Sequence, residues 1–462
     1  MSAPADLICD VVVLGLGPGG EYAANKLARA GLDVVAVDEL LVGGECPFFG
    51  CTPSKLMIRG GNVLAEARRV DGLGGTVEVH PDWTVAADRV RKATNDWHDH
   101  PHADRLEESG ARIVRGHGRL DGPGRVAVDT PDGRVVLEGR RGVVLNSGTR
   151  PSVPPVDGLA GTPYWTNREV VRVDALPASL AVVGGGAIGC ELAQVFARFG
   201  SQVTLLQSSD RLMTREEPEV SEVVVRALRR EGIDVRLGAS LDGVSYDGDA
   251  FTLTVDGERL EAERLLVATG RTPNLDDVGL DTVGLDPAAA SVPVDERMRA
   301  GDGSQRLWVV GDVTGLGPYT HVARYQGAVA VRDLLGEDGP WAEYHGVTHV
   351  TFTDPEVGGV GLTEATAREH GIDVRVGTAQ VERSARGWIE GDDVEGVVKV
   401  VADAATGVLV GASVAAPSGG EVLGLLSAAV HARTPVATLR GMHFAYLTFH
   451  RVVEAALADL DL

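Results

Sequence analysis

Cysteine, aromatic residues, basic charge and long apolar runs are all scarce in this sequence of 462 residues. Its 4 cysteines are too few for the disulfide framework of a small secreted domain. With 43 lysines and arginines against 66 aspartates and glutamates, the formal net charge is −23, so nucleic acid is not an expected partner. No apolar run approaches the roughly 20 residues needed to cross a bilayer, so no membrane association is expected either.

The sequence begins MSAPADLICD, without the basic start or the apolar segment of a secretory signal. We therefore expect a cytoplasmic, reducing location, where a close pair of cysteines is redox-active or metal-binding more often than a static staple. The hydrophobic content of 44% suits a globular protein, and the length leaves room for about three domains.

A strand–glycine–helix–strand unit opens the chain. Gly15, Gly17 and Gly20 form G-x-G-x-x-G directly after the apolar segment 9–14, and a second strand ends at Asp38. Glycines at these positions permit a tight turn and let backbone N–H groups and a helix N-terminus approach a pyrophosphate. The carboxylate can accept hydrogen bonds from a ribose diol, so this unit predicts a dinucleotide site.

The same unit returns about 170 residues later, with Gly184, Gly186 and Gly189 in the turn. Here the second strand ends at Gln207 instead of an acid, and the following segment carries Ser208 and Arg211. A carboxylate would favour NADH and repel a 2′-phosphate, so its absence favours NADPH. The alternative is that Arg211 is a solvated charge and that either nucleotide binds.

The remaining segments suggest how the chain is organised. A helix is expected around 54–69 and strands within 112–145, and the segments 264–274 and 306–315 each contain a further buried strand. From about residue 345, strands precede Gly/Ala-rich helices that begin near 419, which indicates a third, α+β domain. The segment WHDHPHAD carries three histidines, His98, His100 and His102; Pro101 interrupts them, so we expect a loop there and no metal site.

Cys46 and Cys51 lie five positions apart in GGECPFFGCTPSK, residues 43–55. The pair could form a structural disulfide, contribute half of a metal site, or cycle between a disulfide and a dithiol. The other two cysteines fall on the nucleotide-binding units, which leaves a four-ligand zinc site poorly supported. Thr52 as a helix cap and Pro53 in the first turn would place the pair at a helix entry, where the thiolate pKa is lowered.

The pattern G-G-x-C-x4-C-x-P-x-K behind an N-terminal G-x-G-x-x-G resembles the flavoprotein (pyridine nucleotide) disulfide oxidoreductases, the family of dihydrolipoamide dehydrogenase, glutathione reductase and mercuric reductase. ATGRTPN, VVGD and TFTDPEVGGVGLTEATA continue the likeness in matching order. The resemblance implies an α/β fold with two Rossmann-like domains and a C-terminal α+β dimerisation domain. The expected ranges are 1–150 with 271–340 for FAD, 151–270 for NAD(P)H and 341–462 for dimerisation, in a homodimer with shared active sites.

Carried over by position, Cys51 lies against the flavin and Cys46 is the interchange thiol that meets the substrate. Lys55 and Glu191 resemble the charged pair near the flavin; the alternative is a surface lysine and a helix-surface carboxylate. The residues expected to contact FAD and NADPH (or NADH) are Gly15, Gly17, Gly20, Asp38, Gly44, Lys55, Gly148, Asp312, Gly184, Gly186, Gly189, Ser208, Arg211, Gly270 and Arg271.

The C-terminal segment FAYLTFHRVVEAAL, residues 444–457, departs from the family pattern. Relatives carry His-Pro-Thr-x-x-Glu there, whose histidine is the acid–base partner of the interchange thiol. Tyr446 stands in place of that histidine and Arg451 in place of the glutamate. If the segment is helical, Tyr446, His450 and Glu454 share one face, so His450 held by Glu454 is a candidate replacement. The alternative is a packing histidine beside a surface glutamate.

The implied function is an FAD-dependent NAD(P)H:disulfide oxidoreductase that acts on a small disulfide or similar soft electrophile. Reduction of mercuric ion or of a quinone is an alternative activity, because mercuric reductases have the same Tyr-Leu-Thr sequence at the position of Tyr446. The missing histidine also leaves open a non-catalytic FAD-binding redox sensor. Phe48 and Phe49, between the cysteines, either make the site apolar or pack in the core.

Overall fold

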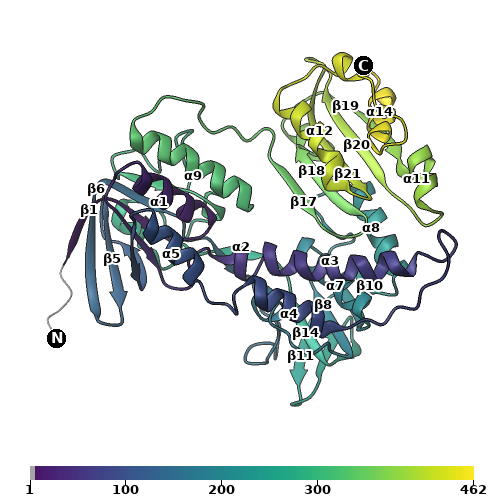
Figure 1. Cartoon of the computed structure of the whole chain (residues 1–462), viewed down its shortest axis with the longest axis horizontal. Helices are drawn as coiled ribbons and strands as arrows, with labels where there is room; N and C mark the ends of the chain where they lie inside the picture. Colours follow the sequence, from purple (N-terminus) through teal and green to yellow (C-terminus); the bar gives the residue numbers. More distant parts are fainter. Residues whose placement is uncertain (1–5) are drawn as a thin grey trace. The chain divides into compact units, whose positions relative to one another are not determined.

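The structure is a computed structural model that describes residues 6–462 (Figure 1). The chain separates into two compact units. The first holds the described residues up to 53 together with 91–152 and 271–343, and the second holds 54–90, 153–270 and 344–462. The units thus group 54–90 with the second nucleotide-binding segment, and the three domain ranges expected above stay a prediction.

The first unit is built on a seven-stranded sheet in the order β3-β2-β1-β6-β5-β4, with β16 also paired to β6. Valines of neighbouring parallel strands face one another, as where Val12 of β1 lies opposite Val35 and Val143. The parallel strands are apolar runs because both of their faces are buried, and the face that carries Val12 and Val35 packs against residues such as Leu275 and Val278. Its elements are β1 (Leu7–Leu14), α1 (Pro18–Arg29), β2 (Val34–Asp38), α5 (His100–Glu108), β3 (Arg112–Arg115), β4 (His117–Leu120), β5 (Arg125–Thr130), β6 (Gly133–Leu145), β16 (Leu307–Val309) and α9 (Thr320–Leu335).

The second unit contains a smaller parallel sheet that repeats this arrangement, in the order β10-β9-β8-β14. A three-stranded antiparallel sheet, β11-β12-β13, lies between β10 and β14 in the chain and shares a core with the parallel sheet around Phe251 and Leu265. The elements are β8 (Ser179–Val183), α7 (Ala187–Phe199), β9 (Gln202–Gln207), α8 (Pro218–Arg230), β10 (Asp234–Leu237), β11 (Leu241–Tyr246), β12 (Phe251–Val255), β13 (Glu258–Ala262) and β14 (Arg264–Val267). Two strand–glycine–helix–strand units are therefore present, as the sequence predicts.

Residues beyond 344 add a five-stranded antiparallel sheet, ordered β17-β18-β21-β20-β19, to the second unit. Alternate residues of β20, such as Val398 and Val400, pack under α12 and α14, while Lys399 points to the opposite face and reaches α8. The elements are β17 (Thr348–Thr351), β18 (Glu356–Gly361), β19 (Val374–Gln380), β20 (Val397–Asp403), β21 (Val408–Ala416), α12 (Gly419–His431) and α14 (His450–Asp459). The expected α+β domain is confirmed.

The segment that contains Cys46 and Cys51 forms the short α2 (Glu45–Phe48) and the start of α3 (Cys51–Arg68), and α4 (Trp83–Ala93) follows. Since α3 begins at Cys51, Pro53 lies in the first turn as predicted, but Thr52 is inside the helix and is not its cap. The remaining short elements are β7 (Thr149–Pro151), α6 (Asn167–Val170), β15 (Arg271–Pro273), η1 (Leu280–Val283), η2 (Asp312–Thr314), α10 (Glu364–Glu369), η3 (Val381–Arg383), α11 (Ala385–Glu390) and α13 (Val436–Arg440).

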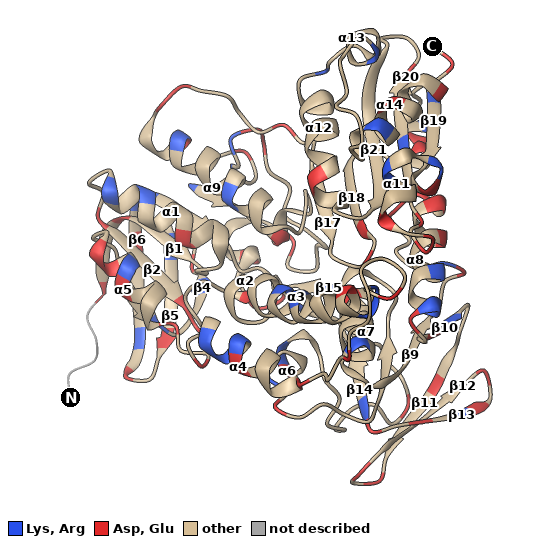
Figure 2. Cartoon of the chain, turned by 45° about the vertical axis from the view of Figure 1, so that its right-hand side comes forward, with Lys and Arg blue, Asp and Glu red and all other residues tan. Residues whose placement is uncertain are grey.

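The histidine-rich segment is not the loop that the sequence suggests, because α5 begins at His100 and includes His102. Within residues 6–462, no group of three or more His, Cys, Asp or Glu is arranged to hold a metal ion. Over the same residues, no helix is both long and apolar enough to cross a membrane. Lys and Arg residues are interspersed with Asp and Glu residues along the elements of each unit (Figure 2).

Candidate active site

The first glycine turn is held tightly against the end of β6. Gly15 has φ of +90°, and a Cβ there would lie 2.3 Å from the carbonyl oxygen of Asn146. The Asn146 side chain accepts a hydrogen bond from Gly20 N at 2.6 Å and donates one to Val310 O at 3.1 Å. This buried asparagine therefore fixes the turn that the sequence predicts, a role that sequence reasoning missed.

Asp38 lies at the end of β2, beside the same turn. Its carboxylate accepts hydrogen bonds from Leu16 N at 2.6 Å and from Leu40 N at 2.8 Å. Burial raises the pKa of Asp38, while these two bonds oppose the rise. The acid is thus fixed in orientation by the backbone around it, as a ribose-binding carboxylate requires.

The two cysteines lie on consecutive helices, Cys46 on α2 and Cys51 as the first residue of α3. Both are free thiols; Cys51 is exposed and its Sγ lies 3.4 Å from Thr320 Oγ1. A hydrogen bond with Cys51, together with burial, raises the pKa of the Cys46 thiol. The two thiols therefore lie close enough to hydrogen-bond each other, and this contact together with burial favours the protonated form of Cys46.

The two phenylalanines between the cysteines are packed inward. Phe48 and Phe49 are both buried, and the Phe48 ring lies 5.6 Å from that of His102. Trp97 also donates a hydrogen bond to Phe48 O at 3.0 Å. Core packing accounts for both phenylalanines, so they do not make an apolar surface around the thiols.

Lys55 and Glu191 form an ion pair in the second unit. Lys55 Nζ lies 2.7 Å from Glu191 Oε2, and the Glu191 side chain is 5% exposed. The other carboxylate oxygen accepts a hydrogen bond from Phe352 N at 2.8 Å, and Lys55 Nζ lies 4.9 Å from the centre of the Phe352 ring. Glu191 is thus not a helix-surface carboxylate, and Lys55 is only partly exposed.

The second glycine turn reproduces the first with one change of chemistry. A Cβ at Gly184 would lie 2.3 Å from Ala268 O, so this position also requires glycine. Gly185 N donates to Gln207 Oε1 at 2.9 Å, the counterpart of the bond between Leu16 N and Asp38. Gln207 therefore accepts the same backbone hydrogen bond in the second turn that Asp38 accepts in the first, but it carries no charge.

Arg211 is bonded to its own loop. Its guanidinium donates to Glu216 O and to Thr214 O, each at 2.7 Å, while Ser208 is exposed. Those two N–H groups hold the segment that follows β9, and the role of Arg211 in coenzyme binding stays a prediction.

The C-terminal segment differs from its expected geometry. Helix α14 begins at His450, and Leu447 has a left-handed φ of +63°, so Tyr446 lies in a turn outside the helix. The prediction that Tyr446, His450 and Glu454 share one helical face is wrong. Glu454 forms an ion pair with Arg451, and no interaction of its carboxylate with His450 is found among the described residues.

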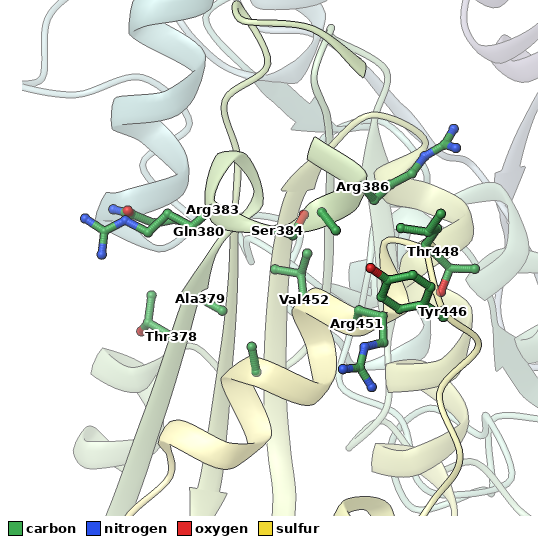
Figure 3. A pocket seen from close by; sticks show the side chains of 13 residues that line it. Thr378, Ala379, Gln380, Arg383, Ser384, Arg386, Tyr446, Thr448, Arg451 and Val452 are labelled. Carbon is green, nitrogen blue, oxygen red and sulfur yellow. The ribbon is translucent and has the colours of Figure 1, made fainter. Parts of the chain in front are cut away.

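Tyr446 is 74% exposed and stands beside a pocket of about 530 Å³. Figure 3 shows the Tyr446 ring and the Arg451 side chain on one side of this pocket and Thr378 and Ala379 of β19 on the other. The segment that replaces the acid–base histidine thus offers a phenol group at the surface of the second unit.

Comparison with known families decides the relationship. Residues 9–327 match the model of the pyridine nucleotide-disulphide oxidoreductases, and residues 347–457 match the dimerisation domain of the same group. The chain belongs to the pyridine nucleotide-disulphide oxidoreductase family. It is an oxidoreductase of the flavoprotein disulfide reductase type, and its family depends on FAD and a pyridine nucleotide.

Relatives of this oxidoreductase carry more than one activity in their names. It is 33% identical to a dihydrolipoyl dehydrogenase of Chlorobaculum tepidum, over 97% of this chain and 96% of that protein. A mercuric reductase of Streptomyces lividans is 32% identical over 97% and 95% of the two chains.

Among solved structures, LpdA of Mycobacterium tuberculosis matches with a TM-score of 0.84 and 26% identity, covering 98% and 99% of the two chains. The Cu(II) complex of the HOCl-induced flavoprotein disulfide reductase RclA from Escherichia coli has the same TM-score and identity, covering 97% and 99%.

The first unit of this oxidoreductase fits FAD at the carboxyl edge of its sheet. The hydroxyl of Ser147 is buried there with no hydrogen-bond partner among the described residues. Gly44 has φ of +69°, and a Cβ would lie 2.7 Å from Gly17 Cα, whereas one at Gly148 would meet open space. Asp312 accepts from Thr149 Oγ1 at 2.8 Å. A buried hydroxyl without a partner, the open position at Gly148 and a fixed carboxylate are suitable contacts for a dinucleotide.

Arg271 shows a positioning role that the sequence did not reveal. Its guanidinium donates to Thr149 Oγ1 at 2.6 Å and to Thr149 O at 2.8 Å, and lies 3.3 Å from Glu45. Arg271 therefore orients the threonine that holds Asp312. Gly270, just before it, has φ of +127° with no atom near a Cβ position.

Proposed function

We propose that this chain is an FAD-dependent NAD(P)H:disulfide oxidoreductase that passes electrons to the Cys46–Cys51 pair and then to a small disulfide. The observation that carries the proposal is the hydrogen-bonded dithiol at the start of α3, in the unit whose sheet edge fits FAD. The dimerisation domain at 347–457 supports a homodimer, in which we propose that each copy completes the other's site.

The chemistry follows from the two sulfurs. Bound FAD supplies hydride acceptance from the nicotinamide and delivery of an electron pair to the Cys46–Cys51 disulfide. The Cys46 sulfur then attacks one sulfur of the substrate, which breaks the substrate S–S bond and releases one thiol. Cys51 attacks Cys46 in turn, releasing the second thiol and restoring the disulfide. The sum is NADPH, one proton and one disulfide giving NADP⁺ and two thiols.

Cys46 needs a hydrogen-bond donor that stabilises its thiolate, because Cys51 and burial raise the pKa of the Cys46 thiol. We propose that Tyr446 of the second copy has this place, as its position in the family pattern and its 74% exposure suggest. His450 is half-buried at the start of α14 and is the less accessible candidate.

We propose NADPH as the preferred reductant. Gln207 already uses its Oε1 to accept from Gly185 N, so its remaining polar group is the NH₂ donor. A donor tolerates a 2′-phosphate, whereas a carboxylate in that position repels it.

A second candidate is the reduction of a soft metal ion or a quinone. It is favoured by Tyr446, since a phenol is a weaker proton acceptor than the histidine of disulfide-reducing relatives. The mercuric reductase of Streptomyces lividans and the Cu(II) complex of RclA give this candidate further support by similarity.

The test is an anaerobic titration of the holoenzyme with NADPH and, separately, NADH, followed by a panel of small disulfides, Hg(II) and quinones. We expect a long-wavelength absorption band from a thiolate beside the flavin, and steady turnover with at least one disulfide. Absence of the band would refute the role of the cysteines. Turnover of quinones that survives Cys46→Ser and Cys51→Ser, with no disulfide turnover in the parent, would favour the second candidate. Flavin reduction without turnover of any acceptor would favour a redox sensor.

A further inference from the structure

One face of helix α7 carries three buried polar residues, Glu191, Gln194 and Arg198. They are three and four positions apart, so they lie along a single stripe of the helix. A buried polar stripe on a helix costs free energy unless each group finds a partner. All three find partners in the segment 352–354, which follows β17 about 160 residues further along the chain.

Each residue of the stripe binds a different part of this segment. Glu191 Oε1 accepts from Phe352 N at 2.8 Å. Gln194 accepts from Asp354 N at 2.8 Å and donates to Asp354 O at 3.0 Å. Arg198 donates to Asp354 Oδ2 at 2.7 Å. Backbone and side chain of the segment are therefore fixed along the helix.

The far end of the stripe is an ion network around the buried Arg198, whose partners Glu231 and Asp354 are about a quarter exposed. The Arg198 side chain is 2% exposed and also bonds Glu231 through Nε at 2.7 Å and Nη2 at 2.6 Å. Asp354 receives a second cation, Arg69. Burial alone would raise the pKa of Asp354, but Arg198 and Arg69 outweigh it and hold that pKa below its usual value. The carboxylate thus stays charged and keeps the segment anchored.

The near end of the stripe is the Lys55–Glu191 pair. One Glu191 oxygen binds Lys55 and the other binds Phe352 N, so Phe352 fixes the rotation of the carboxylate. The Phe352 ring also lies 4.9 Å from Lys55 Nζ, within reach of a cation–π attraction. Any shift of the segment therefore displaces the Phe352 amide that donates to Glu191 and the Phe352 ring that contacts Lys55.

We propose that Gln194 and Arg198 are positioning residues for flavin reduction. By fixing Asp354 they hold Phe352, and Phe352 holds the Lys55–Glu191 pair in one geometry. Functional groups need positioning to within about 0.5 Å, and a satisfied network of this kind provides it. The inference rests on the proposed function only in placing the Lys55–Glu191 pair beside the flavin.

The test uses Gln194→Leu in the holoenzyme, because leucine nearly keeps the volume and loses both hydrogen bonds to Asp354. Hydrogen–deuterium exchange of the 348–356 peptide reports the Phe352 amide directly, and we expect faster exchange. Stopped-flow mixing with NADPH under anaerobic conditions should show flavin reduction slowed roughly tenfold, in the range of couplings between contacting residues. Asp354→Ala, which keeps the backbone bonds to Gln194, is a milder second variant with a smaller slowing.

A double-mutant cycle separates positioning from general damage. In a Glu191→Gln background, Gln194→Leu should change the rate of flavin reduction less than twofold, because the group it positions is already altered. Lys399→Met is the matched control: it removes a buried lysine bonded to Glu217 and Glu219, and it should lower stability without slowing flavin reduction. An equal slowing in both backgrounds, or an unchanged rate despite faster exchange, would overturn the proposal.

Failure of this inference is distinguishable from failure of the proposed function. Flavin reduction by NADPH is measured before any acceptor is added, so it does not depend on which disulfide, metal ion or quinone is the acceptor. If Cys46 and Cys51 prove inactive, the cycle still reports on Gln194 and Arg198.

Discussion

Changing Gln207 to glutamate should reverse the coenzyme preference. The substitution keeps the oxygen that accepts from Gly185 N at 2.9 Å, so the glycine turn is preserved while one negative charge is added. At a separation of about 5 Å and an effective dielectric constant of about 40, suited to a half-buried side chain, two unit charges interact by roughly 1.7 kcal/mol. A 2′-phosphate carries about −1.5 to −2 charges, so NADPH binding should weaken by about 3 kcal/mol, or roughly a hundredfold.

NADH should be affected in the opposite direction, because the new carboxylate can accept from the free ribose diol, as Asp38 is expected to do for FAD. A charged hydrogen bond of this kind is worth about 1.5 kcal/mol, or roughly tenfold. The assay is kcat/KM for each coenzyme at fixed acceptor concentration, with Kd from titration of the oxidised holoenzyme. Their ratio should move by about a thousandfold in total.

The matched control is Gln202→Glu, at the exposed opposite end of the same strand β9. It adds the same charge to the same element, and its coenzyme ratio should change by less than threefold because exposed charges at that distance are screened. If Gln207→Glu weakens both coenzymes equally, or if Gln202→Glu has the same effect, then Gln207 does not face the 2′-position and the reasoning from the turn is wrong.

Three further outcomes are expected. Cys51→Ser should abolish disulfide turnover and the long-wavelength band while NADPH still reduces the flavin in stopped-flow; residual disulfide turnover above about 1% would contradict the electron path. Tyr446→Phe should lower kcat for disulfides by ten- to a hundredfold, as loss of a general acid–base group does, and His450→Gln should lower it less; the reverse order would assign the role to His450. Asp354→Asn should cost about 2 kcal/mol at pH 7 in urea unfolding. Because the folded-state pKa of Asp354 is lowered, this cost should shrink as the pH falls through that pKa, and a cost independent of pH would mean that Arg198 does not stabilise the charged form.

Local patterns predicted the parts of the fold that local physics controls. Gly15 and Gly184 must have positive φ and lie within van der Waals contact of a backbone carbonyl, so the glycine requirement is visible in the sequence. The apolar runs of β1 and β8 are visible for a related reason, since residues 11–14 and 180–183 are buried in a parallel arrangement of strands. Pro53 was placed correctly because proline favours the first turn of a helix, and α3 begins at Cys51; the redox role of the two cysteines stays a prediction.

The failures occurred where tertiary structure overrides the local pattern. Residues 444–457 have a helical pattern, but Leu447 adopts the left-handed conformation that a leucine rarely takes, and the helix starts three residues later. Glu454 then pairs with Arg451 instead of orienting His450. Nor did any spacing rule suggest that Glu191 would meet Phe352, because such long-range contacts are set by how separate segments pack.

Helix α7 begins at the second glycine turn, and two helical turns further along it binds the segment 352–354 through Gln194. This arrangement limits how the protein can be recombined with its relatives. A chimera that imports residues 153–270 from another reductase, for example to change the coenzyme, also imports a foreign α7 stripe and leaves Asp354 and Phe352 facing side chains they were not matched to. Such chimeras should bind the new coenzyme and yet reduce flavin slowly, until residues 352–354 are exchanged together with the helix. The part of the chain that has to be exchanged as a unit is therefore discontinuous: it consists of residues 153–270 and residues 352–354.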